Sequence, residues 1–370
     1  MRVALHVDGT AIRGNEVQAI VIARELKKRG HHVGVSCIAG GVVEAELRRL
    51  GIETTDARPR GDAEIVGAMR FAAWLRRGRY DALLLTSWKR SFATGWAGRV
   101  AGVPRIVYRV GGVHRIPGGP SGWKHRRTLL RYVDCVVANS GVVVDHLRRS
   151  VPDLPPERIR LVLNGAEIAP APPAGLRSEL SLASDDLLAV AVGGLERRKG
   201  YDVVFEALAA LGDPALHFAI AGEGAERVAL EARARALGID RQVFFLGQRG
   251  DVPALLAAAD LFVLASRSEG FSVALLEAMA ARVPALSTDV GGAREALAPR
   301  DARPAAGWIF PREDASALAD ALREVASGVR IGSPEVMARV EEGAWRMANW
   351  FTVDAMMDGI EAALRGDRAG

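Results

Sequence analysis

Residues 259–297 read ADLFVLASRSEGFSVALLEAMAARVPALSTDVGGAREAL. The apolar run Leu261–Leu264 has the length of a buried strand, and the loop after it leads to Ser272, a residue suited to cap the helix that follows. Pro284–Ser287 is a second short apolar run, before the glycines of DVGG. Because strands and helices alternate in this way, the segment predicts part of a parallel β-sheet covered by helices.

The same alternation extends outward over the whole chain. In the first half the expected strands are Val3–Val7, His32–Cys37, Ala82–Leu85, Arg105–Val110, Cys135–Ala138 and Ile159–Leu163, with helices such as Glu16–Arg29 and Val42–Leu50 between them. In the second half they are Leu187–Val192, His217–Ala221, Gln242–Leu246, Leu261–Leu264, Pro284–Ser287 and Trp308–Phe310. The sequence therefore predicts an α/β fold with parallel sheets.

The chain has a clear candidate for a domain boundary. A length of 370 residues exceeds one typical core, which favours two domains. The segment 168–175 reads IAPAPPAG, and its three prolines predict a stiff linker. We therefore expect one domain over 1–167 and a second over 176–349. The tail from about Pro334 to Leu364 is expected to be helical, with Trp345 and Trp350 as packing residues.

Composition and charge restrict the function classes. The N-terminus reads as a first core strand rather than a signal peptide, and no apolar run reaches the eighteen or more residues of a spanning helix. Cys37 and Cys135 lack ligand spacing, which favours inert core thiols in a reduced cytoplasm. Residues 1–170 carry 28 Lys and Arg against 15 Asp and Glu. This excess indicates an anionic partner for the first half, or else only an arginine-rich solvated surface.

The loop Val192–Tyr201, VGGLERRKGY, is a candidate phosphate site. Two glycines end a strand, Lys199 follows, and a helix begins. Glycines allow an anion to approach the backbone, a helix N-terminus offers free N–H groups, and lysine supplies a point charge. The loop has neither the dinucleotide G-x-G-x-x-G spacing nor the Walker A sequence, which argues against NAD and ATP.

The loop between Leu264 and the next helix is a second candidate. Glu269 lies in this loop and Glu277 lies in the helix capped by Ser272. Carboxylates can accept hydrogen bonds from vicinal sugar or ribose hydroxyls, and the N–H groups of 270–272 suit a phosphate. An acidic first helical turn that only complements the helix dipole explains the same spacing, and the spacing alone does not decide between them.

The segment 259–297 resembles the donor signature of the retaining glycosyltransferases of family four, which have the GT-B fold, and Glu269 and Glu277 have their E-x7-E spacing. Further matches follow in order along the chain: Gly14-Asn15-Glu16, Ala138-Asn139-Ser140, Leu163-Asn164-Gly165, Lys199-Gly200 and Phe245-Leu246-Gly247. The resemblance implies two Rossmann-like domains facing a central cleft. In this fold we expect residues from about 350 to 370 to pack back on the first domain.

The resemblance also assigns roles. Lys199 would neutralise the donor diphosphate, Glu277 would bind the ribose hydroxyls, and Glu269 would hold the transferred sugar. The remaining donor-binding residues implied are Gly14, Gly194, Arg198, Gly247, Arg249, Gly270, Phe271 and Ser272. His114, in the loop after the strand Arg105–Val110, would contact the donor sugar, although a lone loop histidine is also common on surfaces. Glu269, Lys199 and His114 are the residues expected at the reacting centre.

Two departures from the family pattern stand out. Gly194 occupies the place of the family's usual arginine, so one diphosphate cation is missing, and Arg198 or Arg197 is expected to replace it. Arg282 stands where the family has a small residue before Val-Pro. No Asp-x-Asp ends a strand, so lysine, arginine and helix dipoles are expected to stabilise the leaving group without a metal ion or cofactor.

A basic stretch with one tryptophan lies in the first half. Arg115–Arg131 contains five Lys or Arg side chains around Trp123, and Lys89 belongs to another loop of this half. Such a stretch can contact anionic lipid headgroups or a phosphorylated acceptor, or it can simply be solvated. No nucleic-acid recognition motif accompanies it.

The resemblance implies a cytoplasmic enzyme, peripheral on the inner face of the membrane, that uses a UDP- or GDP-sugar and a glycan or glycolipid acceptor. It implies retention of anomeric configuration, in the synthesis of cell-envelope glycans, glycolipids or polysaccharides. A catalytically silent GT-B subunit and a GT-B sugar-nucleotide epimerase are the alternatives. An oxidoreductase would need a dinucleotide fingerprint that the chain lacks.

Overall fold

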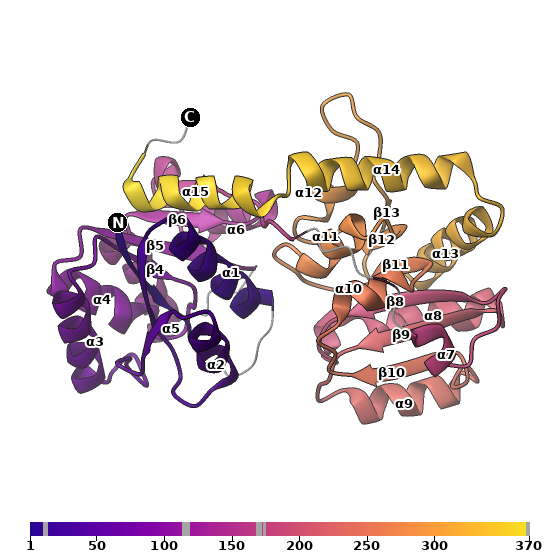
Figure 1. The fold of residues 1–370 in the computed structure, drawn as a ribbon, viewed down its shortest axis with the longest axis horizontal. Coiled ribbons are helices and arrows are strands. Elements are labelled where there is room, and N and C mark those ends of the chain that lie inside the picture. Colours follow the sequence, from indigo (N-terminus) through magenta and orange to yellow (C-terminus); the bar gives the residue numbers. More distant parts are fainter. Residues whose placement is uncertain (10–13, 113–118, 168–171, 173–174, 368–370) are drawn as a thin grey trace. The chain divides into compact units, whose positions relative to one another are not determined.

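The computed structural model describes residues 1–9, 14–112, 119–167, 172 and 175–367. The chain divides into two compact units. Unit 1 comprises Met1–Asn164 together with Asp354–Gly370, and unit 2 comprises Gly165–Val353. Most of the predicted linker 168–175 lies outside the described residues. Each unit is an α/β structure, as the sequence predicts (Figure 1).

Unit 1 is built on a seven-stranded parallel sheet in the order β3-β2-β1-β4-β5-β6-β7. Its strands are β1 (Arg2–His6), β2 (His32–Ser36), β3 (Glu53–Thr55), β4 (Ala82–Leu85), β5 (Arg105–Val110), β6 (Cys135–Ala138) and β7 (Ile159–Leu161). Its helices are α1 (Gly14–Lys28), α2 (Val42–Arg49), α3 (Ile65–Gly78), α4 (Ser91–Ala101), α5 (Gly119–Arg127), α6 (Gly141–Ser150), α15 (Val353–Arg365), a π-helix η1 (Thr128–Tyr132) and a 3-10 turn η2 (Pro156–Arg158).

Both faces of the unit 1 sheet are covered. Alternate residues of β4, β5 and β6 pack with α3, α4 and η1 in one apolar cluster. The residues between them, such as Leu84, Val107 and Val137, are also buried and point to the opposite face. Strands buried on both faces read as continuous apolar runs, which is why β4, β5 and β6 were predictable to the residue.

Unit 2 is built on a six-stranded parallel sheet in the order β10-β9-β8-β11-β12-β13. Its strands are β8 (Leu187–Val192), β9 (Leu216–Ala221), β10 (Val243–Gly247), β11 (Leu261–Leu264), β12 (Ala285–Thr288) and β13 (Trp308–Phe310). Its helices are α7 (Leu176–Glu179), α8 (Tyr201–Leu211), α9 (Arg227–Ala236), α10 (Val252–Ala257), α11 (Val273–Ala280), α12 (Ala293–Leu297), α13 (Ala315–Arg330), α14 (Pro334–Asn349) and a 3-10 turn η3 (Arg197–Lys199).

Two features of the fold add detail to the sequence-based prediction. The short strand β3 was missed, because its residues Glu53–Thr55 are polar and lie at the edge of the sheet. The helical tail comprises two helices, because α14 ends at Asn349 and α15 begins at Val353. Helix α15 belongs to unit 1, where the family resemblance places residues from about 350. Trp345 and Trp350 contact each other as a perpendicular pair with ring centroids 5.3 Å apart, but Trp345 is 37% exposed.

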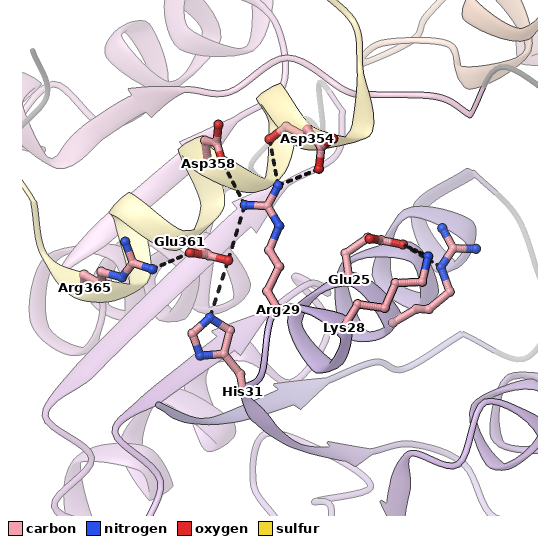
Figure 2. A network of polar contacts seen from close by, with 9 residues as sticks. Glu25, Lys28, Arg29, His31, Asp354, Asp358, Glu361 and Arg365 are labelled. Atoms are coloured by element: carbon pink, nitrogen blue, oxygen red, sulfur yellow. Dashed lines mark hydrogen bonds and ion pairs between the residues drawn. The ribbon is translucent and has the colours of Figure 1, made fainter.

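Helix α15 returns to unit 1 and is held there by charge (Figure 2). Arg29, just after α1, lies with Nη2 2.8 Å from Asp354 Oδ1 and Nη1 2.6 Å from Asp358 Oδ1. Glu361 also faces Arg29 and accepts from Arg365. Arg105 Nε donates to the carbonyl of Ala363 at 3.0 Å, so α15 is tied to the sheet as well as to α1.

Both cysteines are buried and free. Burial raises the pKa of the Cys37 thiol to about 11, and it also raises the pKa of Cys135. Over the residues that the structure describes, no helix combines the length and the apolar character needed to cross a bilayer.

Candidate functional site

The candidate site in unit 2 lies where the strand order reverses. The two neighbouring strands β8 and β11 are connected to opposite halves of the sheet, with β9 and β10 on one side and β12 and β13 on the other. In open parallel sheets, ligands bind beyond the carboxyl ends of such a pair of strands. The loop Gly193–Gly200 follows β8 and the loop Ala265–Ser272 follows β11, so both predicted loops meet at this switch point.

The loop after β8 is held closely against the loop after β11. Gly200 has φ +67°, and a Cβ at this position would lie 2.1 Å from the carbonyl oxygen of Ala265, so only glycine fits here. The N–H of Arg267 donates to the carbonyl of Arg198 at 2.7 Å, and its guanidinium Nη1 donates to the carbonyl of Arg197 at 2.7 Å. These contacts place Lys199 beside the loop after β11.

Lys199 and Glu269 form the centre of the site. Lys199 Nζ lies 2.6 Å from Glu269 Oε1, and the two side chains are only 11% and 12% exposed. The hydroxyl of Ser266 donates to the same oxygen at 2.9 Å, and Arg198 Nη1 lies 3.5 Å from it. The structure therefore brings together two cations and a carboxylate that are about 70 residues apart in the chain.

The segment 270–272 leads from this centre into α11. The hydroxyl of Ser272 accepts from the N–H of Leu275 at 3.3 Å and caps the helix, as predicted from the sequence. The carbonyl of Gly270 accepts from the N–H of Gly292 at 2.8 Å. None of the hydrogen bonds among the described residues uses the N–H of Gly270 or Ser272. This helix start can therefore offer N–H groups to an anion.

Glu277 lies on α11 and differs from Glu269 in the partners of its carboxylate. No described residue donates a hydrogen bond to the Glu277 carboxylate or pairs with it. Burial alone raises the pKa of this carboxyl above its ordinary value. A half-buried carboxylate without a partner is costly for the fold. Its position in the second turn of the helix, beyond the Lys199–Glu269 centre, suits hydroxyl groups of a ligand as the missing partners.

The surroundings of three other predicted residues of unit 2 are also described by the structure. A Cβ added at Gly194 would meet its nearest atoms, Glu196 Oε1 and the carbonyl of Glu223, at 3.4 Å, which is ordinary contact. Gly247 has φ +69°, which favours glycine. Arg249 makes a bidentate pair with Asp251, both N–O distances being 2.9 Å, and this pairing raises the arginine pKa.

The remaining predicted residues lie in unit 1 or are not described. Gly14 begins α1, and an added Cβ would have nothing within 4 Å. Lys89 is an exposed residue after β4. His114 and Arg115 lie outside the described residues.

Sequence reasoning missed a buried arginine in unit 1. Arg109 of β5 is only 2% exposed, and burial lowers its pKa to about 10. Its guanidinium donates to Asn164 Oδ1 at 2.6 Å and to Asn15 Oδ1 at 3.3 Å. These two asparagines belong to the motifs quoted above. An arginine inside the apolar run RIVYRV is the signal that could have drawn attention to it.

Within the described parts of the chain, no group of three or more His, Cys, Asp or Glu side chains is placed to hold a metal ion.

Two family profiles match the chain. The profile described as Glycosyl transferases group 1 matches residues 176–339, and the one described as Glycosyltransferase Family 4 matches residues 12–169. The chain belongs to glycosyltransferase family 4. Each profile covers most of one half of this glycosyltransferase, so the assignment does not rest on the donor signature alone.

Curated relatives and solved structures agree with the family. The D-inositol 3-phosphate glycosyltransferase of Saccharomonospora viridis is 29% identical to this glycosyltransferase over 332 residues, which is 82% of this chain and 74% of that protein. HepE of Anabaena, solved with UDP-glucose, superposes with a TM-score of 0.84 at 21% identity, covering 99% of this chain and all of that one. WaaG, solved as a glycosyltransferase involved in lipopolysaccharide biosynthesis, gives a TM-score of 0.73 at 21% identity, with 98% of each chain covered. The predicted GT-B fold is confirmed.

Proposed function

We propose that this glycosyltransferase moves a sugar from a nucleoside diphosphate sugar to an acceptor hydroxyl, with retention of anomeric configuration. The observation that carries the proposal is the pairing of Lys199 with Glu269 at the switch point of unit 2, next to the unpartnered carboxylate of Glu277. A cation for a diphosphate and two carboxylates for hydroxyl groups are thereby grouped at one sheet edge.

Each side chain has a proposed role in donor binding. Lys199 and the N–H groups of 270–272 bind the diphosphate, and Arg198 supplies the charge that Gly194 lacks. Glu269 accepts from the hydroxyls of the transferred sugar, and Glu277 accepts from the ribose. Gly247 and Arg249 bind the base. The Lys199–Glu269 pair must open for these roles, so the donor competes with an existing ion pair.

The proposed reaction needs no nucleophile from the protein. The bond from the anomeric carbon to the leaving phosphate oxygen breaks, and the acceptor oxygen forms a new bond to that carbon on the same face. The acceptor proton passes to the leaving phosphate. Charge that develops on the diphosphate is stabilised by Lys199, Arg198 and the start of α11, which replaces a metal ion in this role. We therefore expect activity in the presence of a chelator and no need for a cofactor.

The donor and acceptor classes are supported by relatives. HepE was solved with UDP and with UDP-glucose, which favours UDP as the carrier, with GDP as the second choice. WaaG acts in lipopolysaccharide biosynthesis, which favours a glycan or glycolipid acceptor in the cell envelope. We place the enzyme in the cytoplasm, on the inner face of the membrane, and we expect no nucleic-acid partner.

The described part of Arg115–Arg131 supports a contact with anionic lipid. Trp123 of α5 is 55% exposed. The guanidinium of Arg127 lies over its ring, 5.2 Å from the centroid, and Phe92 lies 6.0 Å away. Arg126 and Arg131 are exposed as well. An exposed aromatic ring among cations is suited to a headgroup region.

A screen of nucleotides followed by product analysis tests the function. UDP, GDP, ADP and their common sugars are compared by thermal shift, because a specific ligand raises the melting temperature by mass action. The sugar nucleotide that binds is then incubated with glycan and glycolipid acceptors, and the anomeric configuration of the product is read by NMR. Binding without transfer or hydrolysis would identify a silent subunit, and conversion of the donor sugar without an acceptor would identify an epimerase.

A further inference from the structure

Unit 1 has a switch point of its own, and charged side chains meet there. The order β3-β2-β1-β4-β5-β6-β7 reverses between β1 and β4. Asp8 follows β1, Arg90 follows β4, and Arg58 follows β3. The carboxyl ends of parallel strands share one edge of the sheet, so these three residues occupy the place where ligands bind in open α/β sheets.

Asp8 holds both arginines. Its carboxylate is fully enclosed, with Oδ2 in contact with the guanidinium of Arg90 and Oδ1 3.4 Å from Arg58 Nη1. Arg58 has a second carboxylate, because its Nε lies 2.9 Å from Asp56 Oδ1. Among the described residues, Arg90 pairs with no carboxylate other than that of Asp8. Asp8 therefore orients two cations, and Asp8 and Asp56 together balance the charges of Arg58 and Arg90.

Several buried polar atoms at this place have no partner. Both ring nitrogens of His6 lack a hydrogen-bond partner among the described residues. The Nε of Arg90 lacks one as well. His6 is fully buried at the end of β1, and burial, together with the charges of Arg58 and Arg90, lowers its pKa to about 3, so the ring is neutral. Buried polar atoms are nearly always satisfied in folded proteins, and their grouping around two arginines indicates a polar ligand.

The cations can be reached from the surface. The Arg90 side chain is 26% exposed, and Lys89 beside it is exposed. Arg90 has φ 60°, a left-handed conformation that is uncommon for arginine, and it immediately precedes α4. Guanidinium groups match the oxygens of phosphate in a forked geometry.

We propose that this cluster is a phosphate subsite for the acceptor. Arg90 and Arg58 bind the phosphate group, and Asp8 orients both. The acceptor is thus a hydroxyl compound that carries a phosphate, either a soluble sugar or polyol phosphate or the phosphate of a lipid headgroup. This inference rests on the proposed function, because it assigns the anion to the acceptor of the transfer reaction.

Binding of inorganic phosphate to the full-length chain tests the subsite. Thermal unfolding is followed at increasing phosphate with ionic strength held constant by chloride. Arg90→Asn removes the charge and keeps a residue that tolerates φ 60°. Arg79→Asn is the matched control, because Arg79 is exposed, has φ 47° and lies in the same unit, just before β4. Lys199→Ala removes the cation of the donor site.

Phosphate is expected to stabilise the wild type, Arg79→Asn and Lys199→Ala, whereas Arg90→Asn weakens phosphate binding at least tenfold. An unchanged shift in Arg90→Asn overturns the subsite, as does loss of the shift in Lys199→Ala, which would place the phosphate at the donor site. Should Arg90→Asn unfold, Arg58→Gln is the second variant, and it must also weaken phosphate binding.

Two further measurements separate this inference from the proposed function and identify the source of the phosphate. UDP binding is expected to survive in Arg90→Asn and to weaken in Lys199→Ala. If the wild type bound no nucleotide, the donor site would be refuted, whereas the result for inorganic phosphate would still stand. Glucose 6-phosphate is compared with phosphatidylcholine vesicles containing phosphatidic acid. Whichever binds, Arg90→Asn must lower that binding, and insensitivity of both to the change refutes the subsite.

Discussion

Lys199 Nζ lies 2.6 Å from Glu269 Oε1, so the loop after β8 contributes the cation and the loop after β11 contributes the carboxylate. The equivalent places in unit 1, after β1 and after β4, hold Asp8 and Arg90 in the opposite order of charge. An ion pair therefore lies at the switch point of each unit. A donor that carries a diphosphate and hydroxyl groups can replace both halves of the Lys199–Glu269 pair.

Separate changes of Lys199 and Glu269 should have opposite effects on nucleotide affinity. Lys199→Ala removes a charged hydrogen bond to the diphosphate and should weaken UDP binding by about 2 kcal/mol, roughly thirtyfold. Glu269→Gln frees Lys199, so UDP should bind as tightly as before or more tightly, while transfer falls at least about a hundredfold. Isothermal titration and initial rates measure the two effects. Unchanged affinity in both Lys199→Ala and Glu277→Ala would remove the site from this edge of the sheet.

Arg198 should act as the second diphosphate cation. Arg198→Ala is expected to weaken nucleotide binding about tenfold, whereas Arg197→Ala, an adjacent exposed arginine without a side-chain partner among the described residues, should change it less than twofold. The space around Gly194 permits a direct check, because an added Cβ meets only ordinary contacts. Gly194→Arg should restore binding to Arg198→Ala, and a double variant as weak as the single one would show that Arg198 plays another role.

Glu277 should make stability depend on pH. Its pKa is raised in the folded chain, so the folded state binds a proton more tightly than the unfolded state, and stability falls as pH rises through the ordinary and then the raised pKa. Glu277→Gln removes this loss. The variant should melt at a higher temperature than the wild type at neutral pH, and the difference should shrink as pH falls toward the ordinary range of a carboxyl. A constant difference across this range would mean that Glu277 is not the titrating group.

The charges on α15 should control how firmly this helix is attached. Arg29→Ala removes the cation shared by Asp354, Asp358 and Glu361, and we expect a loss of about 1 kcal/mol of local stability, seen as roughly fivefold faster amide exchange in α15. Lys28→Ala is the control, because Lys28 pairs with Glu25 within α1 (Figure 2). High salt should reduce the difference between Arg29→Ala and the wild type.

Membrane association should depend on the cations around Trp123. Each basic residue near an anionic leaflet contributes about 1 kcal/mol, so changing Lys124, Arg126 and Arg127 to Gln should abolish most sedimentation with anionic vesicles at low salt. Neutral vesicles should not sediment the protein, and high salt should release it from anionic ones. Equal sedimentation of wild type and variant would assign these residues to a solvated surface.

The sequence predicted the fold well where packing is strongest. Leu187–Val192 and Leu261–Leu264 were located to the residue because central parallel strands are apolar on both faces. The turn between α14 and α15 has no signal in the local pattern, because Trp350 and Phe351 continue an apolar helical pattern. The return of the chain to unit 1 near residue 350 was expected only from the family resemblance.

The candidate site was predictable only in part. Each loop after a strand could be identified from its own residues and from the family resemblance. The pairing of Lys199 with Glu269, and the contact of Asp8 with Arg90, join residues far apart in the chain, and only the strand order brings them together. Local pattern carries no signal for such pairs, and it also gave no reason to single out Ser266 or Arg267.

The path of the chain has a consequence for biosynthesis. Unit 2 is one continuous segment, Gly165–Val353, but unit 1 is completed only by residues from Asp354 onward. Residues 1–164 are therefore made before α15, and the apolar side chains that α15 covers, such as Val162 against Gly359, stay uncovered until unit 2 has also been translated. The part of the enzyme that is begun first is the part that can finish folding last.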